Sequence, residues 1–461
     1  MSSSARRTLS AFLMLVGLGT PSVRAQRPNR ATLAAKVDTI AQAAMAAEHI
    51  PGLSIAVLRG ADTVVLRGWG YANVELRAPA TPQTVYRLGS ITKQFTALAI
   101  LQLVEQGRLT LDDTLQRFVP NFPTPGRHVT IRQLLNHTSG IPSYTSIGRT
   151  WQDKMRLDLS HDSLLALVKD RAPDFAPGER FLYDNTGYYL LGMVIESASG
   201  QSYAQYLAQH EFAPLGLAAT SYCETRPVIA DRAQGYQVDS SGAVANADFI
   251  SMSQPFAAGS LCSTVLDLLT WQRALAGDRL VRPGGYAMMS TPGRLNNGNA
   301  TGYGFGLGAS TANGHRQIGH GGGINGFSTQ LSAYPDDSLT VVVLANSEDA
   351  NTTRIAQRIA RAAFGIAEPV VRDLAVSAVE AARVGGTYRL NDALDLRVFA
   401  RGDSLMMQAT GQGASRLLSQ GGGVFVASFD PDVRVTFEMT GDRSPALVLH
   451  QGADRRAPRV N

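Results

Sequence analysis

Two segments about 290 residues apart each carry two β-rich runs and an amphipathic helix, and this match in type constrains the fold most. The helices and runs lie at residues 33–48, 53–58 and 63–66 near the start, and at 326–334, 338–344 and 351–364 far downstream. The residues Arg59-Gly60-Ala61-Asp62 between the first two runs are typical of a hairpin. We therefore expect one sheet built from both segments, with the two helices covering it.

The section between these segments has mostly helical patterns. Helices are predicted at residues 94–106, 131–136, 163–170, 186–197, 202–212 and 264–276. This section is expected to pack on the other side of the sheet. The predicted fold class is α/β (α+β), with an antiparallel sheet flanked by helices and a mostly helical subdomain.

The pattern changes after Gly365. Residues 366–384 are predicted to be a linker, and from there to the end the chain has only short β-type runs separated by Gly or Asp. The clearest runs are 405–409, 424–428 and 433–439. This spacing predicts a small all-β barrel or sandwich over residues 385–461.

The first 25 residues are typical of an export signal. Arg6 and Arg7 precede a short apolar run at 9–18, and small residues at 23 and 25 flank Arg24 before Gln26. A twin-arginine signal is the alternative interpretation. The main domain would then cover residues 26–365, and the protein would be periplasmic or secreted. No later segment reaches about 18 uninterrupted apolar residues, so stable membrane insertion is not expected.

The charge balance does not indicate a nucleic-acid partner. The net charge of +5 falls to +2 once the three arginines of the first 25 residues are set aside. Only four of the 42 basic residues are lysines, so a motif that requires lysine is informative. The oligomeric state stays open.

Cys223 and Cys262 are the two cysteines of the chain. In an oxidising compartment they could form a disulfide, and the alternative is two buried thiols. Neither has a second Cys or a His at ligand spacing, so no metal site is predicted, and no cofactor is implied.

Several common hydrolase motifs are absent, including Gly-x-Ser-x-Gly and His-Glu-x-x-His. The chain does contain Ser90-Ile91-Thr92-Lys93 before an apolar helical pattern. Residues three apart share a helix face, so the Lys93 amine can reach the Ser90 hydroxyl. A partly buried amine with a lowered pKa can activate such a nucleophile, although a surface helix cap is the simpler interpretation of four letters.

Two further constellations follow. Tyr183-Asp184-Asn185 places a phenol and a carboxamide two residues apart before a helix, and His320-Gly321-Gly322-Gly323 closes a predicted strand. Taken singly, Tyr183 could be a packing residue, Asn185 a helix cap and His320 a polar residue at a glycine-rich turn.

In this order and spacing, the three constellations resemble those of the serine β-lactamase and penicillin-binding-protein superfamily, in its class C-like and D-aminopeptidase-like or esterase-like branch. The resemblance covers residues 31–365. It includes four further stretches, 134–141, 188–192, 214–216 and 258–260, and the last of these leads to Asp267. Residues 385–452 are similar to the lipocalin-like barrel that follows this domain in some relatives.

The resemblance implies a role for each residue. Ser90 would be the acylated nucleophile, and Lys93 and Tyr183 would transfer protons. Asn185, His320, Gly322 and Gly323 would contact the substrate, with the N–H groups of Ser90 and Gly323 forming an oxyanion hole.

Two departures from the family pattern are Asp184, where a small residue is usual, and His320, where lactamases have lysine. His320 is expected to have a pKa near 6.5, and so to favour substrates without an obligatory carboxylate.

The predicted function is therefore that of an exported serine hydrolase acting on small amides or esters, such as D-amino-acid peptides or esters. A β-lactamase and a non-catalytic penicillin-binding or sensor protein are the alternatives. The expected partner is a small-molecule or peptide substrate.

Overall fold

The structure is a computed structural model that describes residues 27–124, 126–391, 394–410, 414–428, 430–451 and 453–460. The predicted export signal lies outside these residues. Among the described residues, no helix is long and apolar enough to cross a membrane.

A seven-stranded antiparallel sheet joins the two distant segments, as predicted. Its strand order is β3-β2-β1-β12-β11-β10-β9. The strands are β1 (Gly52–Arg59), β2 (Asp62–Asn73), β3 (Ala78–Pro79), β9 (Gly308–Ala312), β10 (His315–Ile324), β11 (Phe327–Tyr334) and β12 (Leu339–Ala345). Strand β1 pairs with β12, from Leu53 opposite Ala345 to Arg59 opposite Leu339. Both strands are almost entirely buried, as expected for central strands covered on two faces.

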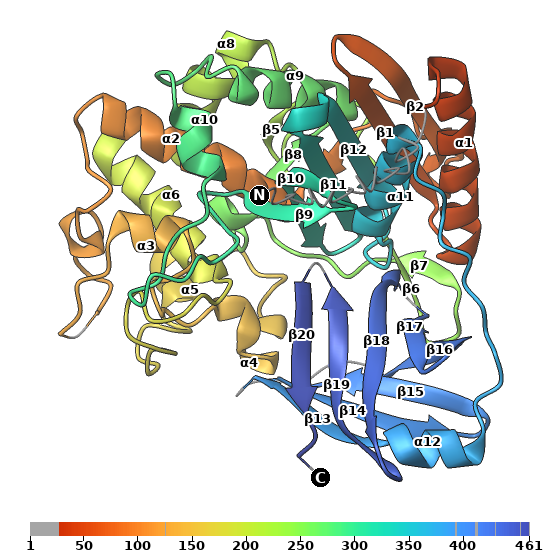
Figure 1. Cartoon of the computed structure of the whole chain (residues 1–461). Coiled ribbons are helices and arrows are strands. Elements are labelled where there is room, and N and C mark those ends of the chain that lie inside the picture. The colour runs from red at the N-terminus through yellow and green to blue at the C-terminus, as the bar shows by residue number, and fades with distance from the viewer. Residues whose placement is uncertain are drawn as a thin grey trace, which may run out of the picture.

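Helices α1 (Arg30–Ala47) and α11 (Thr352–Phe364) lie side by side on one face of the sheet (Figure 1). Leu33, Val37 and Ile40 of α1 pack with Ile355 and Ile359 of α11 in one buried cluster that includes β1 and β12. The prediction that the first and last helices of this region cover the sheet is therefore confirmed.

The opposite face carries the mostly helical section. Its helices are α2 (Thr92–Glu105), α3 (Ile131–Leu135), α4 (Arg149–Gln152), α5 (His161–Leu165), α6 (Asn185–Ser199), α7 (Tyr203–Leu207), α8 (Ala213–Leu215), α9 (Val265–Ala276) and α10 (Gly285–Ser290). The five residues that directly follow α7, Ala208–Phe212, form a π-helical turn. In place of the helix predicted at 163–170, the structure has the shorter helix α5. This helix begins earlier, because Ser160 caps it, and it ends at Leu165.

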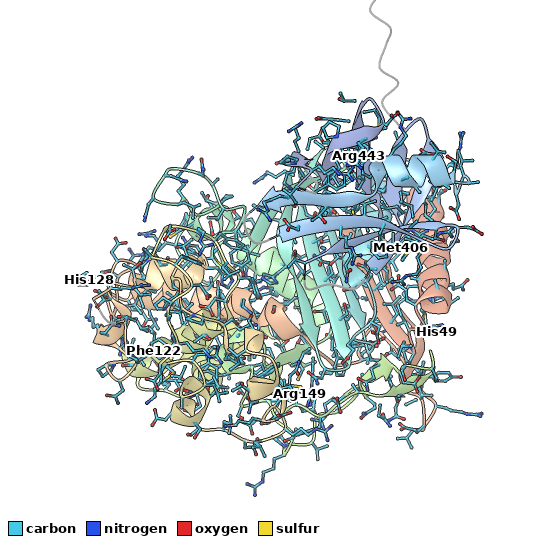
Figure 2. The ribbon with its side chains drawn as sticks, turned by 90° about the horizontal axis from the view of Figure 1, so that it is seen from below. His49, Phe122, His128, Arg149, Met406 and Arg443 are labelled. Carbon is cyan, nitrogen blue, oxygen red and sulfur yellow. The ribbon has the colours of Figure 1, made fainter. Side chains whose placement is uncertain are left out.

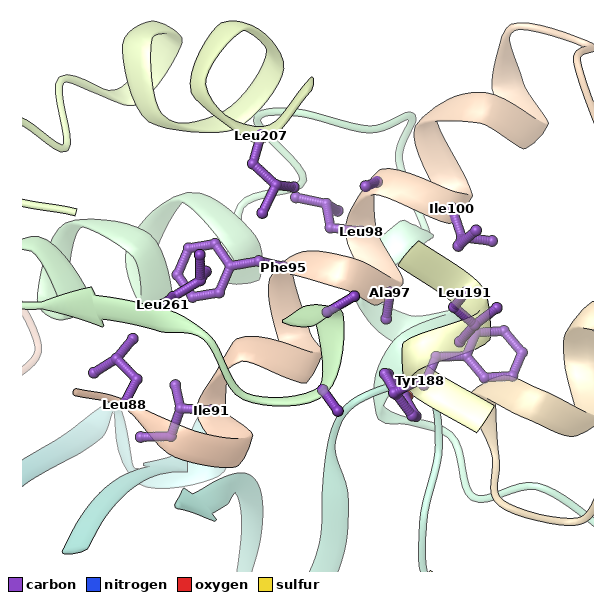
Figure 3. Packing of buried hydrophobic residues seen from close by; sticks show 14 of the residues in the cluster. Leu88, Ile91, Phe95, Ala97, Leu98, Ile100, Tyr188, Leu191, Leu207 and Leu261 are labelled. Carbon is purple, nitrogen blue, oxygen red and sulfur yellow. The ribbon is translucent and has the colours of Figure 1, made fainter. Parts of the chain in front are cut away.

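Helix α2 is the centre of this section. All residues from Thr92 to Leu103 are buried, so the helix has no solvent face, which is the pattern of a helix enclosed by others. In this buried cluster, Phe95 of α2 lies beside Leu261, and Leu98 lies beside Leu207 (Figure 3). The residues at its N-terminus are therefore fixed on every side.

Two small sheets complete the main body. One contains β4 (Tyr86–Arg87), β5 (Ser221–Tyr222) and β8 (Leu261–Ser263), and the other contains β6 (Tyr236–Val238) and β7 (Val244–Asn246). The first fixes the segment that enters α2, because β4 pairs with β8 directly before Leu88.

The C-terminal part contains α12 and an eight-stranded antiparallel sheet in sequential order. Its elements are α12 (Ala378–Val384), β13 (Gly386–Asn391), β14 (Leu394–Arg401), β15 (Ser404–Ala409), β16 (Ala414–Gly421), β17 (Val424–Ala427), β18 (Asp430–Thr440), β19 (Arg443–Gln451) and β20 (Ala453–Pro458). Val460 donates its N–H to the Thr387 carbonyl at 2.8 Å, which nearly closes the sheet into a barrel. The barrel, marked by Met406 and Arg443, lies away from Phe122 and His128 of the helical section (Figure 2).

Candidate active site

Ser90 lies in a 3-10 turn, Gly89–Ile91, that leads directly into α2. Gly89 has φ +54°, and a Cβ at this position would lie 2.9 Å from the Gly323 nitrogen. Only glycine combines this backbone conformation with such a close approach. The turn therefore brings Ser90 against the end of β10, although about 230 residues separate them in the chain.

Lys93 lies one helical turn after Ser90 and is fully buried. Its Nζ lies 3.2 Å from Ser90 Oγ, 2.8 Å from the Asn185 Oδ1 and 2.8 Å from the Ala258 carbonyl. Burial lowers the pKa of Lys93 well below its ordinary value, and the nearby Asp184 carboxylate opposes this effect. A neutral amine has two N–H groups for Asn185 and Ala258, so its lone pair would face the Ser90 hydroxyl.

Tyr183 packs beside the same amine. Its ring centroid is 4.8 Å from Lys93 Nζ, and its buried hydroxyl makes no hydrogen bond of normal geometry. Burial raises its pKa, and the adjacent Ser90 hydroxyl lowers it to a smaller extent. Tyr183 is therefore a neutral phenol at neutral pH, with a free hydroxyl next to the serine.

Asp184 rather than Asn185 is the cap of α6. Its carboxylate accepts the N–H groups of Thr186 at 2.7 Å and Gly187 at 3.0 Å, which fixes the helix N-terminus. Burial raises the pKa of Asp184 to about 7, although these backbone donors and the Lys93 charge lower it. The cap holds Tyr183 and Asn185 in place on either side of it.

Asn185 is left free to use its side chain in the site. Its Oδ1 accepts from Lys93, and its Nδ2 donates to Thr145 Oγ1 at 3.0 Å. The structure therefore places Ser90, Lys93, Tyr183 and Asn185 together, as the predicted motifs require.

His320 lies in β10 with its ring partly buried beside Tyr183. Its Nε2 lies 2.9 Å from the Tyr303 hydroxyl, and its Nδ1 faces the Gly321 carbonyl. The expectation of a pKa near 6.5 is wrong, because burial and the Lys93 charge lower the pKa of His320 to about 4. The ring is therefore neutral over the whole physiological range.

Gly322 and Gly323, the second and third residues after His320, occupy different surroundings. A Cβ on Gly322 would lie 1.9 Å from the Leu88 carbonyl, so this glycine allows β10 to approach the segment before Ser90. Gly323 has no atom within 4 Å of a Cβ position and lines the cavity beside Ser90. Of the two, only Gly323 faces the cavity.

His137 and Tyr303 also contribute to the site, although no motif predicted a role for either residue. The His137 Nδ1 accepts the Asp184 N–H at 3.1 Å, and its ring lies 4.4 Å from the Tyr183 ring. His137 has φ +59°, an uncommon conformation for a bulky residue. The stretch His137-Thr138-Ser139-Gly140 was a signal for His137, but no local pattern marks Tyr303.

Cys223 and Cys262 are both buried free thiols that interact with each other, so the structure favours the second of the two alternatives. Cys262 lies in β8, and Cys223 directly follows β5. Among the described residues, no group of three or more His, Cys, Asp or Glu side chains could hold a metal ion.

Comparison with known proteins gives three consistent findings. The family model described as Beta-lactamase matches residues 37–365. The chain is 31% identical over 438 residues to penicillin-binding protein 4* of Bacillus subtilis (strain 168), which covers 88% of this chain and 94% of that protein.

Among solved structures, the octameric penicillin-binding protein homologue from Pyrococcus abyssi matches with a TM-score of 0.68 at 29% identity, covering 92% of this chain and 99% of that chain. A D-stereospecific amidohydrolase from Streptomyces sp. matches with a TM-score of 0.62 at 30% identity, covering 73% and 99%.

Proposed function

The chain belongs to the Beta-lactamase family and is a serine hydrolase, and from this premise we propose that Ser90 forms an acyl-enzyme with small esters or amides. The observation that carries the proposal is the position of the Lys93 Nζ, 3.2 Å from Ser90 Oγ with a second, unpaired proton carrier at Tyr183. These are the groups that nucleophilic catalysis by serine requires.

In the proposed reaction, Ser90 Oγ attacks the substrate carbonyl carbon while its proton passes to the Lys93 amine in its neutral form, which burial of Lys93 favours. The N–H groups of Ser90 and Gly323 would stabilise the oxyanion. Tyr183 and Lys93 then protonate the leaving amine or alcohol as the bond to the carbonyl carbon breaks. Water deprotonated by the same pair attacks the ester carbon, and the acid leaves as the Ser90 hydroxyl is restored.

Small D-amino-acid peptides, amides and esters are the proposed substrates. The name of the Streptomyces amidohydrolase supports this class, and the neutral His320 supports substrates without an obligatory carboxylate. We further propose that the protein is exported, because of the apolar run after Arg6 and Arg7.

The test is covalent labelling followed by turnover. A fluorophosphonate should label the purified protein once, at Ser90, and nitrophenyl esters should be hydrolysed at a rate that Ser90→Ala abolishes. Ser241→Ala, in an exposed turn, is the control and should keep both properties.

Labelling or turnover that persists in Ser90→Ala would refute the assignment. A chromogenic cephalosporin in the same panel tests the β-lactamase alternative, which requires the cephalosporin to be the best substrate. Labelling without any turnover would instead support the non-catalytic alternative.

A further inference from the structure

A cavity of about 240 Å³ opens beside the proposed nucleophile and identifies one half of the substrate. Ser90, Asn185 and Gly323 are among the residues that line it. The inference drawn from it rests on the proposed function, because it concerns the group that Ser90 would carry.

The cavity would receive the acyl half of the substrate. The leaving group must lie next to the proton donor, which is Tyr183, and neither Tyr183 nor His320 lines this cavity. The two halves of a substrate extend in different directions from the carbonyl carbon. The half on the cavity side therefore stays attached to Ser90 after the leaving group departs.

Much of the lining of this cavity is apolar and aromatic, and Tyr144, Trp151, Ile250 and Ile324 form this part. The polar side chains of Thr145, Asn185 and Asn325 also line it, and all of them are uncharged. The Tyr144 hydroxyl is already used, because it donates to the Gln254 carbonyl at 2.8 Å. An aromatic or branched side chain would therefore meet ring and alkyl surface here.

No described residue that lines the cavity is charged. A free α-ammonium group would find no carboxylate there, and a carboxylate would find neither Lys nor Arg. Placing an unpaired charge in such surroundings is strongly unfavourable. Among the proposed D-amino-acid substrates, the cavity therefore favours those whose α-amine is acylated over those whose α-amine is free and charged.

A single buried residue holds two walls of the cavity, Trp151 through its side chain and Tyr144 through its backbone carbonyl. Gln254 is fully buried, and its Oε1 accepts from Trp151 Nε1 at 3.1 Å. Its Nε2 donates to the carbonyls of Leu157 at 2.7 Å and Lys154 at 3.2 Å, and its own carbonyl accepts from Tyr144. The loop around Gln254 and the segment containing α4 are thereby joined across about 100 residues of chain.

We propose that the enzyme selects uncharged acyl groups with an aromatic or branched apolar side chain, an α-amine being absent or acylated, and that Gln254 is the positioning residue for this selectivity. Trp151 would provide the contact surface. Gln254 would keep the Trp151 indole and the Tyr144 ring at a fixed separation.

Two matched pairs of nitrophenyl esters test the proposal: phenylacetate against acetate, and N-acetyl-D-phenylalanine against D-phenylalanine at a pH where its amine is charged. The first member of each pair should have the higher kcat/KM, by about tenfold or more, as expected for a hydrophobic pocket. Equal values, or a preference for the free amine, would overturn the proposal.

Variants locate the selectivity. Trp151→Ala and Gln254→Leu should bring the phenylacetate-to-acetate ratio close to one, while acetate hydrolysis falls much less. Gln254→Glu, which can still accept from the indole, should keep a higher ratio than Gln254→Leu. Tyr71→Ala, at an exposed aromatic residue on β2, is the control and should leave the ratio unchanged.

A general loss of stability would lower both rates together and leave the ratio near its original value, and this result would overturn the role given to Gln254. Failure of the proposed function is distinguishable, because turnover would then survive in Ser90→Ala. Turnover that depends on Ser90 without acyl selectivity overturns only the further inference.

Discussion

Replacing Asp184 by asparagine removes a buried charge from the middle of the Tyr-x-Asn constellation while keeping the size of the side chain. The native carboxylate accepts two backbone N–H groups of α6, one on each oxygen. Asparagine has one acceptor oxygen, so one buried N–H loses its partner. This loss alone should destabilise the folded protein by about 1 to 3 kcal/mol.

Removal of the Asp184 charge has the opposite effect on stability, because the buried charge destabilises the native protein. Burial raises the pKa of Asp184 from 3.8 to about 7, so between these values the folded protein holds a proton that the unfolded chain releases. Native stability therefore falls as pH rises through this window, and stops changing above the folded pKa. Between pH 5 and pH 8 the change approaches two pKa units, or about 3 kcal/mol.

The variant lacks this penalty. Asp184→Asn should be less stable than the native protein at pH 5, and should gain about 3 kcal/mol relative to it by pH 8. Urea unfolding at both pH values measures the difference directly. Asp403→Asn, in an exposed turn between β14 and β15, is the control and should show no such gain. A stability difference between Asp184→Asn and the native protein that is constant from pH 5 to pH 8 would contradict a raised pKa of Asp184 in the folded protein.

Four other experiments test separate parts of the structure. Lys93→Ala and Tyr183→Phe should each lower kcat for a nitrophenyl ester by about 100-fold or more, and the double variant should be little worse than the poorer single one; multiplied defects would indicate independent roles. A protein that ends after Phe364 should keep ester hydrolysis, and a folded but inactive truncation would show that the barrel completes the site. Thiol titration of the unfolded, unreduced protein should find two reactive cysteines, and finding none would mean a disulfide. His320→Lys should raise kcat/KM for substrates with a carboxylate relative to neutral esters, and an unchanged ranking would show that this position does not read substrate charge.

The parts of the fold that the sequence predicted are those with strong apolar periodicity. The two strand pairs and their helices were found because their runs are long and rich in Val, Leu and Ile. Strand β9, at the edge of the sheet, was missed because it has no buried residue and so no apolar alternation. Strands β4 and β5 have two residues each, and tertiary contacts alone determine them.

A similar distinction applies to the site. Ser90 and Lys93, or Tyr183 and Asn185, are neighbours in the chain, so their spacing alone could indicate a shared site. Gln254 and Trp151 are about 100 residues apart, and nothing in either local pattern relates one to the other. The pKa of His320 was also beyond sequence reasoning, because it depends on burial and on the Lys93 charge in three dimensions.

The pairing of β1 with β12 has a consequence for synthesis of the chain. At roughly 5 to 20 residues per second, the partner of β1 leaves the ribosome about 15 to 60 seconds after β1 itself. During that time the β1–β2 hairpin has one edge without its native neighbour, and its apolar residues lack their final cover. The nascent chain therefore has to be kept from aggregating until almost the whole of this region exists, and the main sheet can close only after synthesis has passed Ala345.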